Sequence, residues 1–124
     1  MPARPLLAGN AVSEHALVSM ESFHSDAVRK VAEAIAREPV VVVGMANNPH
    51  VARARQVLDA AGIPHTYLGF GSYISGWKPR LAIKMWSGWP TFPQVFVRGV
   101  LVGGASDTKK ALTDGSLKQR LAAG

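Results

Sequence analysis

Cysteine is absent from all 124 residues of the chain. This absence excludes disulfide bonds, thiolate metal ligands and thiol nucleophiles, because each of them requires the sulfur of that residue. A domain of this length buries about two thirds of the surface of its unfolded form, so it folds without a disulfide or a structural metal. Any chemistry of this chain therefore uses groups other than thiols.

Long apolar runs are also missing. Residues 1–20 contain scattered apolar residues, but Asn10, Ser13 and Glu14 interrupt them before the core of a signal peptide could form. No stretch approaches the roughly 20 apolar residues that a membrane span needs. We therefore expect a soluble, cytoplasmic protein that does not contact a membrane.

Acidic residues are few. The chain has 8 Asp and Glu against 14 Lys and Arg, which gives a formal net charge of +6. An excess of positive charge attracts anions, whether nucleic acid, phosphate or a small acidic ligand. The basic residues are scattered, however, and form no long run and no repeat with aromatic residues. We therefore do not expect direct binding of nucleic acid.

A helix followed by a buried strand is the first clear pattern. From about Asp26, apolar residues recur at the spacing of one helix face. They are Val28, Val31, Ala32 and Ile35. Pro39 ends this helix, and the four valines at 40–43 are β-branched and apolar on both faces. This run predicts a central strand that is buried on both sides.

A second helix and a second strand follow. Pro49 suits the first turn of a helix, one apolar stripe continues from there, and Gly62 stops it. Residues 63–68 are then a strand candidate, and residues 77–86 form a further helical stretch. A strand, a helix and a strand within about 30 residues form a βαβ unit, whose two strands are parallel.

The last third of the chain predicts an antiparallel hairpin and a helical end. Residues 94–97 and 100–102 are short apolar strands joined by a tight turn. Residues 106–121 are helical, in two pieces broken near Gly115. We predict an α/β fold with a four-stranded mixed sheet and helices on both faces. Residues 1–20 are expected to be an irregular extension, and 21–124 the domain.

This order of elements resembles the thioredoxin fold, and three motifs within about residues 39–121 are similar to motifs of the glutaredoxin family. The first is Asn48–Val51, which follows the buried strand at the place of the glutaredoxin redox loop. By this resemblance Asn48 stands at the position of the nucleophilic cysteine, and Val51 at that of the second cysteine of dithiol members. Met45 takes the place of a glutathione-binding lysine. The resemblance therefore implies no catalytic residue in this chain.

The second motif runs from Arg80 to Gln94 and resembles monothiol glutaredoxins. It keeps every position of the pattern Arg-x-x-x-Lys-x-x-x-x-Trp-Pro-Thr-x-Pro-Gln. The resemblance implies that Pro93, two residues after Thr91, follows a cis peptide bond, which only X-Pro sequences adopt at low cost. It also implies that Phe92 offers its backbone to the cysteinyl part of glutathione, like an added strand. Arg80 matches an arginine that reaches the glycyl carboxylate.

The third motif, Gly103–Ser106, resembles the Gly-Gly-Cys-Asp turn of the family. Backbone amides there would hold the γ-glutamyl carboxylate at a helix N-terminus, where unpaired N–H groups and the helix dipole favour an anion. Ala105 and Ser106 replace the family's Cys-Asp, and Asp107 is close enough to substitute for the lost acid. The ligand-binding residues that the motifs imply are Arg80, Thr91, Phe92, Pro93, Gly104, Ala105 and Ser106.

Each motif also has a purely structural interpretation. A cis proline and a pair of glycines serve the architecture wherever this fold occurs. Arg80 and Lys84 could be solvated charges on one helix face. His50 lies beside Asn48 and could act as an acid-base group, but the other histidines show no metal-ligand spacing. We therefore expect no metal site, and the role of His50 stays open.

Three functional hypotheses follow. Disulfide exchange requires a thiolate, and an iron-sulfur cluster requires a cysteine ligand, so we expect neither at Asn48. The first hypothesis is a redox-inactive module without a cofactor that binds glutathione, a glutathionylated protein or a related anionic thiol ligand. The second is a protein-interaction scaffold or homodimer with a vestigial groove, anchored by Phe70, Tyr73 and Trp77. The third is a residual glutathione-dependent oxidoreductase activity.

Overall fold

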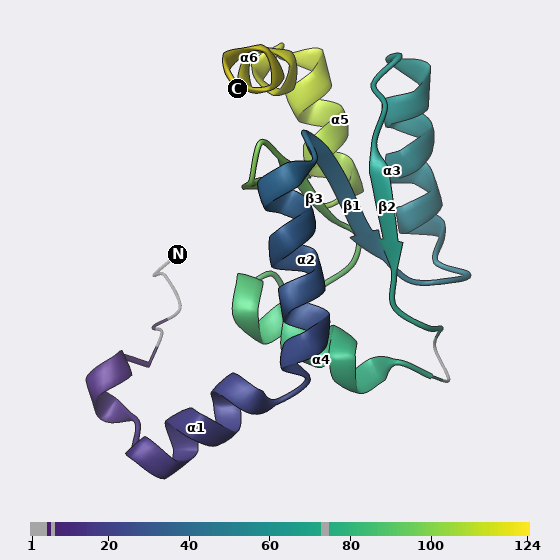
Figure 1. Ribbon diagram of the computed structural model, residues 1–124. Coiled ribbons are helices and arrows are strands. Elements are labelled where there is room, and N and C mark those ends of the chain that lie inside the picture. The colour runs from purple at the N-terminus through teal and green to yellow at the C-terminus, as the bar shows by residue number, and fades with distance from the viewer. Residues whose placement is uncertain (1–4, 6, 73–74) are drawn as a thin grey trace.

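The computed structural model of the chain describes residues 5, 7–72 and 75–124. Its centre is a four-stranded sheet in the order β2-β1-β3-β4 (Figure 1). The strands are β1 (Val40–Gly44), β2 (Thr66–Gly69), β3 (Gln94–Val97) and β4 (Val100–Gly103). β1 is parallel to β2 and antiparallel to β3, which is antiparallel to β4. The predicted mixed sheet is therefore confirmed.

β1 is the buried centre of the fold. Its side chains alternate between the two faces of the sheet, so its valines contribute to two separate cores. Val41 and Val43 pack with residues of α2 (Ser25–Arg37) and α4 (Trp77–Ser87). Val40 and Val42 pack on the other face with α3 (Pro49–Ala60), α5 (Ala105–Thr113) and α6 (Ser116–Ala123). Helices thus cover both faces, as the apolar valine run predicted.

The helix ends follow their capping residues. Gly88 adopts a positive φ of 77° after α4, and its N–H donates to the carbonyl of Lys84 over 2.8 Å. Gly115 has a φ of 83° and separates α5 from α6. The predicted break of the C-terminal helical region near Gly115 is therefore confirmed.

Two expectations about elements were wrong. Residues 1–20 were expected to be irregular, but α1 (Glu14–Ser22) is a helix, preceded by the short 3-10 turn η1 (Gly9–Ala11). The Ser13 hydroxyl caps α1 by accepting the N–H of Ala16 over 3.1 Å, a local signal that the weak apolar pattern obscured. β2 begins only at Thr66, because Pro64 has no N–H for pairing with β1.

No helix within the described ranges is long and apolar enough to cross a membrane.

Candidate functional site

Asn48 closes the N-terminus of α3 with its own side chain. Its Oδ1 accepts the backbone N–H of His50 over 2.9 Å and that of Val51 over 3.2 Å. These are N–H groups of the first helix turn, which have no partner inside the helix. A carboxamide is neutral and carries no nucleophilic lone pair comparable to a thiolate. At the position where the resemblance places a nucleophilic cysteine, this chain therefore has a residue that caps a helix.

The two other altered positions of the first motif belong to the core. Met45 and Val51 are both buried. A Cβ at Gly44 would lie only 2.7 Å from Cγ1 of Val51. The Val51 side chain therefore occupies the space that a side chain at Gly44 would need. Met45 and Val51 therefore contribute packing where the resemblance places polar or thiol groups.

The turn before β3 has the expected backbone. The Phe92-Pro93 peptide bond is cis, which confirms the prediction for Pro93. The Phe92 side chain is buried, and the Nζ of Lys84 lies 5.5 Å from the centre of its ring. Thr91 is exposed at the tip of the turn. The buried ring anchors the turn, so the backbone beside Thr91 is held in place.

The start of α5 is organised by Asp107. Its Oδ2 accepts the N–H of Gly104 over 3.0 Å, and a Cβ at Gly103, whose φ is 125°, would lie only 2.6 Å from the same oxygen. The capping carboxylate therefore requires glycine at 103. The N–H groups of Ala105 and Ser106 belong to the first turn of α5 and have no acceptor within that helix. These two donors therefore need an acceptor from outside the helix.

The cis-proline turn and the start of α5 meet in one groove of about 250 Å³. The groove brings together Thr91, Phe92, Pro93, Gly104, Ala105 and Ser106. His50, Trp89 and Asp107 complete its lining, although the motif pattern did not include them in the predicted set. His50 extends from the first turn of α3, which explains why sequence spacing could not place it there. Most of the predicted ligand residues thus share a single surface.

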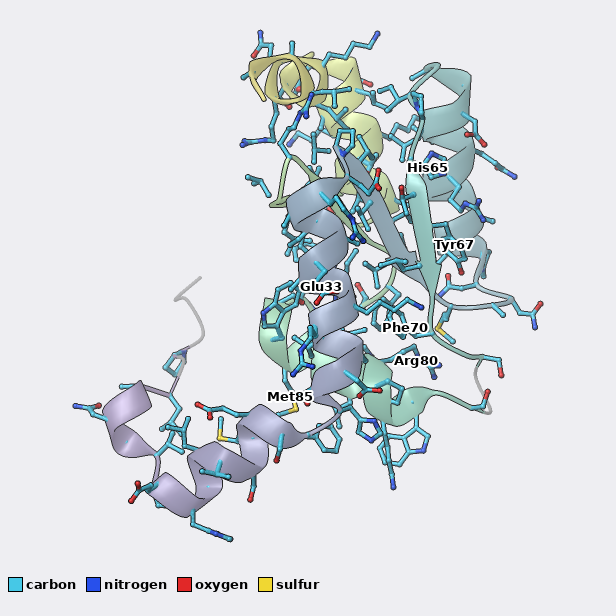
Figure 2. All side chains as sticks on the ribbon, in the orientation of Figure 1. Glu33, His65, Tyr67, Phe70, Arg80 and Met85 are labelled. Atoms are coloured by element: carbon cyan, nitrogen blue, oxygen red, sulfur yellow. The ribbon has the colours of Figure 1, made fainter. Side chains whose placement is uncertain are left out.

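Arg80 is the predicted ligand residue that does not line this groove. Its side chain is buried, and its Nη1 donates to the carbonyl oxygens of Phe70 over 2.8 Å and of Ser75 over 2.7 Å. Figure 2 shows Arg80 and Phe70 close together below the end of β2. Phe70 itself packs against the core, with the Nζ of Lys30 5.8 Å from its ring centre. In this structure Arg80 ties the segment after β2 to α4.

The three aromatic residues that the scaffold hypothesis named as anchors differ in how far the structure exposes them to solvent. Trp77 is exposed at the start of α4, whereas Phe70 is half-buried and packs against the core. Tyr73 lies outside the described residues. Trp77 is therefore the anchor that the structure leaves accessible.

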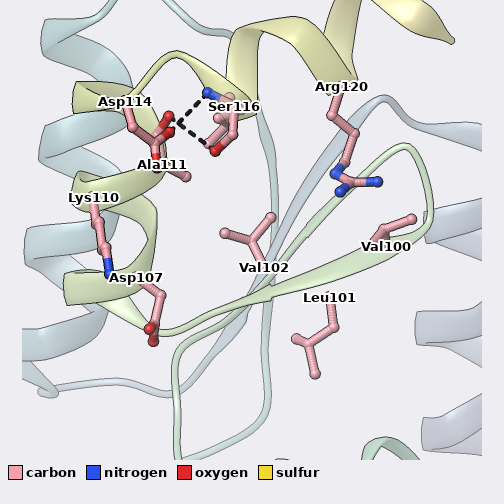
Figure 3. Close-up of a pocket in the computed structure, with 10 residues that line it drawn as sticks. Val100, Leu101, Val102, Asp107, Lys110, Ala111, Asp114, Ser116 and Arg120 are labelled. Carbon is pink, nitrogen blue, oxygen red and sulfur yellow. Dashed lines mark hydrogen bonds between the residues drawn. The ribbon is translucent and has the colours of Figure 1, made fainter.

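Another hollow, of about 290 Å³, lies between β4, α5 and α6 (Figure 3). Its charged lining residues are Asp107, Lys110, Asp114 and Arg120. The two acids and two bases give it no net charge, and it contains none of the predicted ligand residues. Across residues 5, 7–72 and 75–124, no three His, Asp or Glu side chains gather into a group that could hold a metal ion.

Asp114 in this hollow provides a test of the junction between α5 and α6. Hydrogen bonds from the hydroxyl and the N–H of Ser116, together with the charge of Lys110, lower the pKa of Asp114 below 3.8. A lowered pKa stabilises the fold above pH 3.8, and this contribution is lost as the pH falls through the folded-state pKa. In Ser116→Ala the hydroxyl is missing, so we expect the pKa of Asp114 to rise toward 3.8. An NMR titration of its carboxyl carbon measures this, and an unchanged midpoint would contradict the assignment.

The sheet order, the crossing β1-α3-β2 unit, the cis-proline turn and the helix N-terminus beside it define a protein of the thioredoxin-fold class. The chain is 51% identical over 98 residues to a glutaredoxin-like protein of Dictyostelium discoideum, covering 79% of this chain and 80% of the relative. It is 33% identical over 70 residues to a probable monothiol glutaredoxin of Legionella pneumophila, covering 56% and 75%. The chain belongs to the glutaredoxin family.

Solved structures agree on the fold. A crystal structure of a buckwheat glutaredoxin-glutathione complex matches with a TM-score of 0.73 at 23% identity, covering 83% of this chain and 94% of that one. Oxidised glutaredoxin 2 of Chlamydomonas reinhardtii matches with a TM-score of 0.69 at 24% identity, covering 81% and 94%. No family model matches the chain. This member of the family contains no cysteine.

Proposed function

We propose that this protein is a redox-inactive glutaredoxin that binds glutathione, or the glutathionyl group of a modified protein, without exchanging disulfides. The observation that carries the proposal is the contrast between two neighbouring regions. The groove at the cis-proline turn and the start of α5 is assembled from the predicted residues, whereas Asn48 is a helix cap. A glutathione complex of a buckwheat glutaredoxin with the same fold supports the choice of ligand.

Exchange would fail at its first step. A thiolate must attack one sulfur of the disulfide and release the other as a thiolate. The Asn48 carboxamide cannot form that sulfur-sulfur bond, and its Oδ1 already accepts two N–H groups. An iron-sulfur cluster would lack its cysteine ligand as well. We therefore propose no cofactor, and measurable turnover in a glutathione-dependent disulfide assay would contradict the proposal.

Binding would use main-chain groups and one helix end. The N–H groups of Ala105 and Ser106 in the first turn of α5 would donate to the γ-glutamyl carboxylate, where the dipole of α5 favours negative charge. The backbone of Phe92 would pair with the cysteinyl residue of the ligand. The net charge of +6 would attract the anion to the chain. These contacts need no thiol, which explains how binding could persist without exchange.

The binding prediction is tested by titration calorimetry with reduced and oxidised glutathione at millimolar concentration. We expect heat of binding with the wild type. Ser106→Asp restores the acid that the family motif has at this position, and we expect it to raise the affinity about tenfold through one charge-assisted hydrogen bond to the ligand ammonium. Ser106→Asn has the same shape without the charge and is the matched control.

Two results would contradict this binding prediction. The absence of heat in both the wild type and Ser106→Asp would show that the groove does not bind glutathione. An equal gain from Ser106→Asn and Ser106→Asp would show that the ligand ammonium is not recognised at Ser106. A cytoplasmic location, where this ligand would be met in solution, remains a prediction.

A further inference from the structure

α1 projects from the domain and leaves its apolar side chains in solvent. Figure 1 shows α1 extending away from the N-terminal end of α2, and none of the α1 residues is buried. Leu17 is 38% exposed, Val18 59% and Met20 48%. An isolated helix of nine residues is marginal in water, because packing of an apolar face provides most helical stability in proteins. α1 therefore carries a face that lacks a partner within the described part of the chain.

α4 exposes a matching stripe. Trp77, Leu81 and Met85 are 55%, 39% and 53% exposed, and their spacing of four residues places them on one side of the helix. The opposite side of α4 is buried through Ala82 and Ile83. We call Trp77, Leu81 and Met85 the α4 stripe. Three large apolar side chains in a row on one helix indicate a contact surface.

Met85 of the α4 stripe also lines an apolar groove near the C-terminal end of α1. The groove measures about 400 Å³ and is lined by Leu17 and Met20 of α1 and by Met85 and Trp86 of α4. In Figure 2, Met85 lies near the C-terminal end of α1. Only two residues, Phe23 and His24, link α1 to α2, and they direct α1 away from its own domain. Leu17 and Met20 of α1 and Met85 of the α4 stripe thus line the same open groove and remain 38%, 48% and 53% exposed, so neither helix covers the other.

The charges of the two helices are complementary. α1 contains Glu14 and Glu21 and no basic lysine or arginine, whereas α4 contains Lys78, Arg80 and Lys84 and no acid. Arg80 is buried, so the accessible charges of α4 are the two lysines. A chain that carries both an acidic apolar helix and a basic apolar stripe is complementary to itself. Two copies related by a two-fold axis make the same contact twice.

We propose that this protein forms a homodimer in which α1 of each protomer packs along the α4 stripe of the other. Leu17, Val18 and Met20 would cover the stripe, while the acids of α1 would face the lysines of α4. The interface uses none of the residues that line the groove at the cis-proline turn. Dimer formation and glutathione binding can therefore be tested separately, and the failure of one leaves the other standing.

The absence of cysteine makes a disulfide-trapping experiment free of background. Val18→Cys places one thiol on α1, and Leu81→Cys places one thiol on the α4 stripe. The two variants are mixed, diamide is added as the oxidant, and covalent dimers are followed by non-reducing electrophoresis. We expect the mixture to cross-link about tenfold faster than Val18→Cys mixed with Val100→Cys, because docking raises the effective thiol concentration.

Val100→Cys is the matched control, since Val100 is 42% exposed on β4 and lines the hollow beside α5 and α6, to which α1 and α4 contribute no residue. Equal cross-linking rates with Leu81→Cys and Val100→Cys would overturn the proposal. Faster cross-linking of Val18→Cys with itself than with Leu81→Cys would also overturn it, because that result would indicate that the two copies of α1 pack on each other.

Sedimentation without cross-linking tests the same surface. We expect the wild type to sediment as a dimer at about 100 µM, within the range of ordinary weak dimers. Met85→Glu adds an acid opposite the acids of α1 and should raise the dimer dissociation constant about tenfold or more. Val100→Glu introduces the same charge at similar exposure and should leave the dimer intact. A monomeric wild type, or a dimer that only Val100→Glu disrupts, would overturn the proposal.

Discussion

Replacing Asn48 with cysteine is expected to produce a reactive thiol with a pKa well below the usual value of about 8.5. The thiolate would lie at the N-terminus of α3, where the N–H groups of His50 and Val51 now donate to Asn48 Oδ1. These donors and the dipole of α3 favour an anion over a neutral thiol. The structure therefore retains the electrostatic environment of a nucleophile at a position that holds a neutral amide.

Two measurements check this first prediction. The absorbance of the thiolate at increasing pH gives the pKa of the new cysteine. Mass spectrometry after addition of oxidised glutathione detects the mixed disulfide, which forms as the thiolate attacks one sulfur and reduced glutathione leaves. We expect glutathionylation of Asn48→Cys and a turnover in the disulfide assay that the wild type lacks.

Ala60→Cys is the control on the same helix. Ala60 is exposed in the last turn of α3, where the negative end of the dipole disfavours a thiolate. Its thiol should have a pKa at or above the usual value and should react slowly. If the pKa of Asn48→Cys is as high as that of Ala60→Cys, the N-terminal donors do not act as described. If the pKa is low but no mixed disulfide forms, the groove does not position glutathione.

Replacing Arg80 with methionine is expected to lower the free energy of unfolding by about 2 to 4 kcal/mol. Methionine fills much of the volume of the arginine side chain but donates no hydrogen bond. The carbonyl oxygens of Phe70 and Ser75 would lose the donor that Arg80 Nη1 provides in a half-buried region. The segment after β2 would then lose both of its hydrogen bonds from the Arg80 side chain.

Urea unfolding of the wild type, Arg80→Met and Arg80→Lys measures this second prediction. Lysine keeps the charge but lacks the planar fork of guanidinium, so we expect Arg80→Lys to recover only part of the loss. Under conditions where all three proteins are folded, glutathione affinity should be equal within about threefold, which is below 1 kcal/mol. Unchanged stability with lost glutathione binding would instead support the ligand role that the family resemblance implies for Arg80.

Local sequence features predicted most of the helices and strands, because the residues that start, build and end these elements lie within the elements themselves. Four consecutive β-branched residues produced β1, Pro49 marked the start of α3, and Gly115 marked the break between α5 and α6. The start of β2 was misplaced for an equally local reason, the missing N–H of Pro64. The helix α1 was missed because none of its residues is buried. A helix that does not pack on the core needs no regular spacing of apolar residues, so the sequence showed none.

The groove was predicted largely through resemblance, whereas the direction of individual side chains was not. The motifs named residues on the cis-proline turn and at the start of α5, which the fold brings together across sequence separations of about ten residues. His50 joins them from α3, far away in the chain. Arg80 matched the motif equally well but hydrogen-bonds to Phe70 and Ser75 instead. A motif specifies that an arginine stands at this position, but the carbonyl groups near Arg80 in the folded chain decide where its guanidinium donates.

By itself, the sequence determined that this chain has no thiol of its own, because chemical composition does not depend on conformation. It also determined the short apolar runs and the helical patterns that build a mixed sheet between two helical layers. Only the tertiary structure decided that Asn48 caps α3, that Arg80 hydrogen-bonds to the chain and does not line the groove, and that apolar side chains of α1 and of the α4 stripe are exposed. These outcomes depend on which polar groups and apolar surfaces meet in space, and such contacts arise only after the elements have packed.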